Sequence, residues 1–307
     1  MRVVSLVPSS TDALAALDSL DLLVGRDHNS GGSPLLDSIP CVTRGLTSDA
    51  DPAAIDRAVA TARQQDGTIN TLDAEALTAL KPDLILTQQC CGVCSPLHDD
   101  VCAVAANISP PPDVLCCDPT SLDDVLDDIE RIAAAIGRIT IATPVLATLR
   151  ASYWQARDLV GHYLDGPRTA VIEWTSPIYL AGHWTPQLIV QAGGQSIGPP
   201  PECASEVWTL DDLIAAAPER IVIAPCGVAI DQITPHLDAL WETGFKKRLP
   251  STVRIAAIDG QRSFSRPGPG LIDTFCWLAA WLTDRPDQFP QSVPFVPLDA
   301  EHGPTAR

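Results

Sequence analysis

The sequence has few basic residues, few aromatic residues and no long hydrophobic run. Lys and Arg number 20 against 38 Asp and Glu, which gives a formal net charge of −18. Because nucleic-acid binding depends on clustered Lys and Arg, this charge balance argues against a nucleic-acid partner. No stretch approaches the roughly 18 apolar residues that cross a bilayer, so we expect no membrane span.

The N-terminus lacks the features of a secretory signal. Only a very short apolar run follows Arg2, whereas a signal peptide needs roughly 7–15 apolar residues before its cleavage site. We interpret residues 3–7 as the first buried strand of the fold. As given, the chain is expected to be cytoplasmic, and periplasmic only if an export signal is missing from this sequence.

Short β-like runs alternate with helical patterns in both halves of the chain. The expected strands lie at 3–7, 83–87, 169–174, 220–224 and 253–258. Alternation of this kind indicates βα units and mainly parallel sheets. The predicted fold class is therefore α/β, with two Rossmann-like lobes.

A long helical pattern separates the two halves. Apolar residues recur at steps of three or four through residues 140–166, which is the spacing of a helix about 35 Å long. Such a helix suits a rigid connection between an N-terminal lobe at 1–139 and a C-terminal lobe at 167–285, with a ligand cleft between the lobes. We expect the proline-rich tail at 286–307 to be loosely ordered.

An internal repetition supports the two-lobe organisation. Residues 75–86 and 212–223 share one pattern: a short helix that begins with acidic residues, then a proline, then a buried strand. This repetition favours two similar lobes over one continuous domain.

Several segments, taken in order, resemble a known family. They are the long central helix and the stretches Arg2-Val3-Val4-Ser5-Leu6-Val7-Pro8-Ser9-Ser10-Thr11-Asp12, Leu80-Lys81-Pro82-Asp83-Leu84-Ile85 and Phe264-Ser265-Arg266-Pro267-Gly268-Pro269. Over residues 2–284 the chain is similar to the cobalamin and iron-siderophore substrate-binding proteins of ABC importers, most closely to their cobalamin-binding branch. The resemblance implies a large metal-containing ligand held between the lobes, and an importer as a partner.

The resemblance also implies two docking carboxylates. Glu75 matches the position on the N-terminal lobe that pairs with importer arginines, and Asp211, or Asp212 beside it, falls near the position on the C-terminal lobe. A simpler interpretation is that acidic residues in first helical turns interact favourably with the helix dipole.

The segment from Glu173 to Trp184 holds an unusual share of the aromatic residues. Two tryptophans, a tyrosine and a histidine follow a predicted strand there, in a chain with only 7 Trp and 3 Tyr. Flat apolar rings suit a macrocycle or another planar ligand. The candidate ligand-binding residues of this lobe are Trp174, Tyr179, His183, Trp184 and Trp208. The alternative is that the tryptophans pack in the core.

Two further residues are candidates for ligand contact. His28 follows a short strand, although a single loop histidine is more often structural. Arg266 precedes the last helix, near a position where the resemblance places a ligand-contacting arginine, and the start of that helix adds partial positive charge.

The cysteines suggest a different kind of site. Cys91 and Cys94 form a Cys-x-x-Cys motif after one strand, and Cys226 follows the corresponding strand of the other lobe. Cys-x-x-Cys spacing suits soft metals such as zinc or iron, and His183 or His28 would complete a tetrahedral set. The alternatives are free thiols packed as small apolar residues and a redox pair.

Catalytic motifs are absent from the sequence. We find no Gly-x-Ser-x-Gly, no phosphate loop and no Gly-x-Gly-x-x-Gly after a strand. The sequence therefore favours non-catalytic binding of a corrinoid or another metal-containing ligand. The alternative is a Cys/His metal-ion site in the cleft, in a metal-binding protein or a metalloenzyme.

Overall fold

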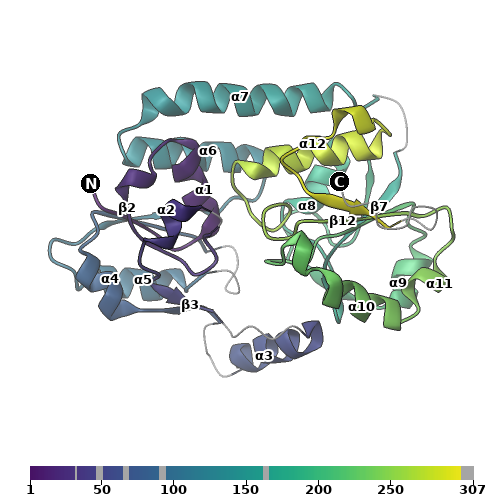
Figure 1. The fold of residues 1–307 in the computed structure, drawn as a ribbon, viewed down its shortest axis with the longest axis horizontal. Helices are drawn as coiled ribbons and strands as arrows, with labels where there is room; N and C mark the ends of the chain where they lie inside the picture. Colours follow the sequence, from purple (N-terminus) through teal and green to yellow (C-terminus); the bar gives the residue numbers. More distant parts are fainter. Residues whose placement is uncertain (32, 46–50, 65–68, 90–94, 162–165, 299–307) are drawn as a thin grey trace. The chain divides into compact units, whose positions relative to one another are not determined.

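A computed structural model describes residues 1–31, 33–45, 51–64, 69–89, 95–161 and 166–298 (Figure 1). The chain divides into two compact units, each treated by itself below. Unit 1 comprises Met1–Ser48, Arg57–Pro119 and Asp123–Thr148, and unit 2 comprises Asp49–Asp56, Thr120–Leu122 and Leu149–Arg307. Boundaries between the units fall inside three helices, α3 (Pro52–Gln64), α6 (Leu122–Ala135) and α7 (Ile139–Arg157).

Unit 1 is built on a parallel sheet in the order β2-β1-β5-β6. Its strands are β1 (Val3–Ser5), β2 (Leu23–Arg26), β5 (Leu84–Thr87) and β6 (Asp113–Cys116), and a small antiparallel pair joins β3 (Thr43–Arg44) to β4 (Thr71–Leu72). The helices are α1 (Pro8–Ala16), α2 (Pro34–Asp37), α4 (Ala74–Leu80), α5 (His98–Ala105) and α6 (Leu122–Ala135), and a 3₁₀ turn covers Leu20–Leu22. The central strands β1 and β5 are buried, as expected of parallel strands covered by helices.

Unit 2 holds a larger mixed sheet in the order β10-β8-β7-β11-β12-β13, and β9 also pairs with β7. The strands are β7 (Arg168–Thr175), β8 (Ile178–Leu180), β9 (Gln195–Ile197), β10 (Glu206–Trp208), β11 (Arg220–Ile223), β12 (Arg254–Ile258) and β13 (Phe295–Pro297). The helices are α8 (Thr185–Gln191), α9 (Leu210–Ala215), α10 (Thr234–Glu242), α11 (Phe245–Arg248) and α12 (Gly270–Leu282), with 3₁₀ turns at Ile230–Gln232 and Pro286–Gln288. Strands β9, β7, β11 and β12 are parallel, whereas β8, β10 and β13 run antiparallel to their neighbours.

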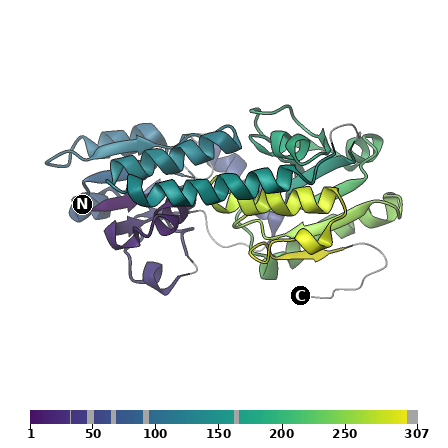
Figure 2. The same ribbon diagram turned by 90° about the horizontal axis from the view of Figure 1, so that it is seen from above.

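Helix α12 forms the apolar centre of one side of unit 2. Almost every side chain of its sequence LIDTFCWLAAWL is buried, so the helix is covered all round. The second half of α7 lies beside it in both views (Figures 1 and 2), where the rings of Tyr153 and Phe275 are 4.9 Å apart. Trp277 stacks on Trp281 at 5.4 Å and also contacts Phe295 of β13.

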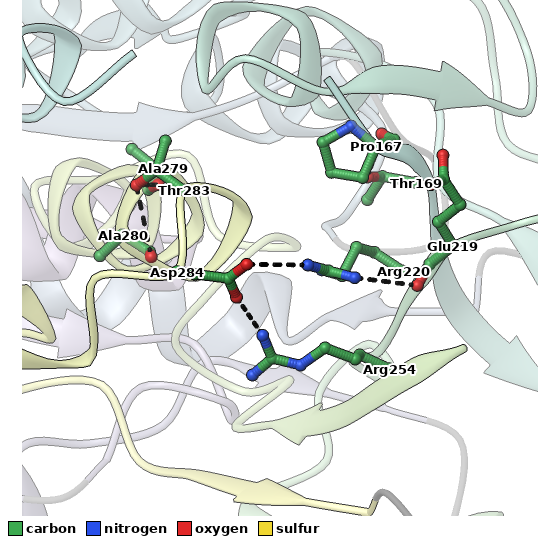
Figure 3. Close-up of polar contacts among 9 residues, drawn as sticks. All are labelled: Pro167, Thr169, Glu219, Arg220, Arg254, Ala279, Ala280, Thr283 and Asp284. Atoms are coloured by element: carbon green, nitrogen blue, oxygen red, sulfur yellow. Dashed lines mark hydrogen bonds and ion pairs between the residues drawn. The ribbon is translucent and has the colours of Figure 1, made fainter. Parts of the chain in front are cut away.

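Ion pairs anchor the end of α12 to the start of two parallel strands (Figure 3). Asp284, just past the helix, accepts hydrogen bonds from Arg220 of β11 and Arg254 of β12. The guanidinium of Arg220 also lies over the Trp281 ring, 5.8 Å from its centroid. Asp284 has a φ of +56°, a backbone conformation that Asp tolerates better than most residues.

The predicted fold class is confirmed: each unit is α/β, and its parallel strands alternate with helices. The repeated pattern is confirmed as well, since α4 leads into β5 and α9 into β11. Even the connecting backbone corresponds, because Lys81 and Ala217, each followed by proline, have φ values of +46° and +45°.

Two expectations need correction. The long helix α7 ends at Arg157 rather than continuing to residue 166, and its last residues give way to a turn before Gly161. The proline-rich tail is more ordered than expected up to residue 298. Its segment β13 pairs antiparallel with β12, because Phe295 gains a packing site against Trp277. Within the part of the chain that the structure describes, none of the helices has the length and apolar character needed to cross a membrane.

Candidate functional site

The strongest candidate site lies on the antiparallel corner of unit 2 formed by β7, β8 and β10. The pairing register puts Trp174 opposite Tyr179, and Tyr179 opposite Val207. Residues directly opposite one another in a sheet share a face, so these three side chains form one row, which we call the aromatic row. Val207 is 56% exposed, which is high for a large apolar side chain, whereas Trp174 and Tyr179 are half-buried.

A buried histidine supports the row from one side. The ring of His236 on α10 meets the Trp174 ring edge-on, with 4.7 Å between centroids. Its Nδ1 lies 2.9 Å from the hydroxyl of Thr175. Burial lowers the pKa of His236 to about 4, so the ring is neutral near pH 7. His236 therefore acts as a fixed, uncharged support for the Trp174 indole.

The aromatic row stands at the edge of the sheet where the parallel strands end. Cys226 follows β11, and its amide donates to the Glu173 carbonyl at 2.9 Å. This bond brings the backbone of Cys226 close to Trp174, the next residue of β7. The turns after β11 and β12 are also joined, since the Gly227 amide donates to the Gly260 carbonyl at 3.2 Å. A Cβ on Gly260 would fall 1.9 Å from the Pro225 carbonyl oxygen, so only glycine fits there. In open α/β sheets this edge is where ligands bind.

The structure separates Trp208 and Trp184 from the aromatic row. Trp208 pairs with Ile178 in the neighbouring register and packs partly against the core of unit 2. Trp184 is 5% exposed and donates its indole N–H to the Phe264 carbonyl at 2.8 Å. The Trp184 indole thus holds the segment after β12 in place. This position fits the alternative interpretation, in which the tryptophans pack in the core.

His183 and Arg266 take structural positions in the same unit. His183 has a φ of +55°, and its amide donates to the Cys203 carbonyl at 2.6 Å, which fixes the turn before α8. Its ring is half-buried against Trp184, with 5.7 Å between centroids. Arg266 is 8% exposed and lies four residues before α12, so little of its guanidinium surface is open to a ligand.

His28 lies at the end of β2 in unit 1 and is held on two sides. Its Nδ1 is 2.8 Å from the Thr43 hydroxyl, and a Cβ on Gly45 would fall 2.3 Å from its Nε2. Burial, the largest effect, lowers the pKa of His28, although Asp27 acts in the opposite direction. These contacts fit the structural interpretation of a single loop histidine.

The proposed thiolate metal site has only one described cysteine. Cys91 and Cys94 lie outside the described residues, and Cys226 is half-buried beside β7. Among the residues that the structure describes, no three His, Cys, Asp or Glu side chains are grouped to hold a metal ion. Burial raises the pKa of Cys117 to about 12 and that of Cys276 to about 11, so both remain protonated thiols near pH 7.

The two expected docking carboxylates occupy corresponding places in their units. Glu75 is exposed in the first turn of α4, and Asp211 is exposed in the first turn of α9. Asp211 forms an ion pair with Arg248 of its own unit. The neighbouring Asp212 belongs to a capping box with Thr209, so its carboxylate already has a local role.

Sequence reasoning missed Val207 and His236 as parts of the site. A weak signal for Val207 was available, because Val207 and Trp208 are adjacent apolar residues, but only the strand register places Val207 beside Tyr179. His236 lies in a helix more than 60 residues from Trp174, and nothing in the local sequence connects the two. Pro52 and Asp56, which bond to Trp174 and Tyr179, were missed for the same reason.

Comparison with known proteins gives matches in structure but not in sequence. No family model and no curated protein matches the chain. Solved structures do match. The periplasmic vitamin B12 binding protein BtuF of Vibrio cholerae is 17% identical with a TM-score of 0.68, covering 94% of this chain and 98% of that one. The periplasmic heme-binding protein RhuT from Roseiflexus sp. RS-1 is 19% identical with a TM-score of 0.67, covering 92% and 98%.

The chain has the fold of these periplasmic binding proteins. A periplasmic heme binding protein from Pseudomonas aeruginosa agrees, at 18% identity, a TM-score of 0.68 and 92% coverage of both chains. The match extends over nearly the whole chain and includes both α/β units. The family resemblance noted in the sequence is therefore accompanied by the same fold.

Proposed function

We propose that this protein binds a planar, metal-containing macrocycle, a corrinoid or a haem, without catalysing a reaction on it. The aromatic row is the observation that carries the proposal. Two flat rings and an exposed valine stand side by side across three strands, at the edge where α/β sheets take ligands. Apolar ring surface of this kind suits the face of a macrocycle, and the three side chains of the row are themselves uncharged.

The fold supports the same proposal. The solved structures that match this chain include proteins named for binding vitamin B12 and haem, which are both large metal-containing macrocycles. A corrinoid was the ligand expected from the sequence, and haem shares the flat apolar face that the row would contact. We favour binding alone because the sequence carries none of the recognised catalytic motifs.

An importer is the proposed partner. Glu75 and Asp211 are exposed carboxylates in the first turns of two corresponding helices, and such groups fit cationic sockets on another protein. Because Asp211 is paired with Arg248, docking would require an exchange of partners at that position.

A spectroscopic titration tests the proposed ligand class. Ferric haem, cobinamide and cyanocobalamin are titrated into the purified protein, and the shift of the absorption bands gives the affinity. We expect at least one of them to bind with a Kd in the micromolar range or below. Val207→Asp, which places a charge in the aromatic row, should weaken binding roughly tenfold or more, since it costs about 1.4 kcal/mol or more in apolar contact and desolvation.

Trp154→Ala is the matched control. Trp154 on α7 is 61% exposed, so this variant removes an accessible indole that is not part of the row. Equal weakening by Trp154→Ala and Val207→Asp would contradict the placement of the ligand, and no binding of any of the three compounds would contradict the proposed function.

A further inference from the structure

The start of helix α3 lies on the aromatic row. Residues up to Asp56 of α3 belong to unit 2. The indole N–H of Trp174 donates to the Pro52 carbonyl at 3.1 Å, and the hydroxyl of Tyr179 donates to the Asp56 carboxylate at 3.2 Å. Both aromatic members of the row are therefore hydrogen-bonded to a single helical turn that is more than 110 residues away in sequence.

This helical turn presents the same polar groups as the proposed ligands. Asp56 offers a carboxylate to Tyr179, and haem carries carboxylates on its propionate chains. Pro52 offers an amide carbonyl to Trp174, and corrinoids carry amide side chains. A ligand seated on the row would approach the same indole N–H and the same phenol hydroxyl, so the turn and the ligand would compete for these donors.

The contact between the turn and the row is limited. Of the residues from Pro52 to Asp56, only Pro52 is buried, and the other four are half-exposed. The turn is formed by its own local bonds, since the Ala53 amide donates to the Asp51 carboxylate at 3.0 Å and the Ile55 amide to the Asp51 carbonyl at 3.1 Å. It can therefore persist as a helical turn when it leaves the row.

We propose that the first turn of α3 is a built-in competitor, which a macrocycle must displace from Trp174 and Tyr179 in order to bind. The inference rests on the proposed function, whose ligand class it uses. The apparent affinity equals the affinity of the open row multiplied by the fraction of molecules in which the row is open. The turn therefore sets how tightly the protein holds its ligand.

Asp56→Ala tests this proposal by removing the Tyr179 contact while leaving the row intact. Ferric haem and cobinamide are titrated into the wild type, Asp56→Ala and the control Asp37→Ala, which removes an exposed carboxylate in unit 1. We expect Asp56→Ala to bind roughly fivefold tighter than the wild type, because one hydrogen bond of the competing turn is lost. Asp37→Ala should bind as the wild type does.

Hydrogen exchange gives an independent readout of the same step. Adding the ligand to the wild type should speed amide exchange in the peptide that covers residues 53–64, because a helical turn held only by its own local bonds opens more often than one that also contacts the row. Equal or weaker binding by Asp56→Ala, or slower exchange in that peptide on adding ligand, would contradict the proposal that the turn competes with the ligand. Neither result would contradict the proposed function. If neither ligand binds to any variant, the proposed function fails and the competitor fails with it.

Discussion

At the scale of single residues, His236 connects the site to the stability of unit 2. It is 3% exposed, and its ring bonds to Thr175 and packs against Trp174. Because burial lowers its pKa from 6.5 to about 4, the folded protein binds this proton less readily than the unfolded chain does. Between these two pH values the unfolded state takes up the extra proton, so stability falls as the pH falls.

We therefore expect the urea midpoint to decrease as the pH is lowered from 6.5 to 4, with about 1–2 kcal/mol of the loss due to His236. In His236→Asn this part of the pH dependence should disappear, whatever the effect of the variant on stability at pH 7. Parallel pH profiles for the wild type and His236→Asn would contradict this role.

Single residues also show which parts of the candidate site could be predicted from the sequence. The cluster of rings between Glu173 and Trp184 directs attention to the end of β7. It does not say which rings share a surface, because that depends on strand register. The register leaves Trp174 and Tyr179 together, and Trp184 is buried as an anchor for the segment after β12.

At the scale of secondary-structure elements, the Asp284 contacts hold α12 to the sheet (Figure 3). One carboxylate serves arginines from β11 and β12, and the Arg220 side chain is 14% exposed. Removing the carboxylate leaves two cations close together, one of them mostly buried, which is costly.

Asp284→Asn should lower the free energy of unfolding of unit 2 by about 1–2 kcal/mol. Asparagine tolerates the positive φ of this position, so the loss reports the ion pairs rather than backbone strain. Urea unfolding followed by tryptophan fluorescence measures the change, since Trp277 and Trp281 lie in the adjoining core. Asp287→Asn, an exposed carboxylate three residues along, should leave the midpoint where it is, and an equal loss in both variants would argue against the anchor.

Elements were predictable where local pattern decides them. Helix α12 coincides with an apolar run, and the strands β5 and β11 follow their helix-proline signals. The strands β8, β10 and β13 are three residues each, and they exist because of partners far away in the sequence. A pattern of three residues carries too little information to indicate such pairings.

At the scale of the whole molecule, the net charge of −18 affects the rate at which a charged ligand associates with the protein. A strongly acidic protein repels anionic ligands, and salt screens that repulsion. We expect the association rate constant of haem, which carries two propionates, to rise about twofold or more as salt increases from low to physiological levels.

Neutral cyanocobalamin provides the control for this salt effect, and its association rate should change little over the same range. Stopped-flow absorbance measures both rates. A haem association rate that falls with added salt would mean that a cationic surface guides the ligand, against the charge balance of the sequence.

The molecule-scale features that the sequence indicated are those set by composition and repetition. The acidic balance was visible directly, the alternation of strand and helix patterns indicated the α/β class, and the repeated helix-proline-strand pattern indicated two units. The assignment of the first turn of α3 to unit 2 was not visible, because Pro52 and Asp56 meet Trp174 and Tyr179 across more than 110 residues.

The most direct measurement of the central claim uses the Trp174 indole as a probe. In protein labelled with ¹⁵N at tryptophan, the seven indole N–H signals are recorded and that of Trp174 is assigned with Trp174→Phe. Paramagnetic ferric haem, or Co(II) cobinamide if it binds more tightly, is then added below stoichiometry. We expect the Trp174 signal to broaden first, while those of Trp154 and Trp281 persist. Broadening of Trp154 ahead of Trp174, or an unchanged Trp174 signal with ligand bound, would contradict binding at the aromatic row.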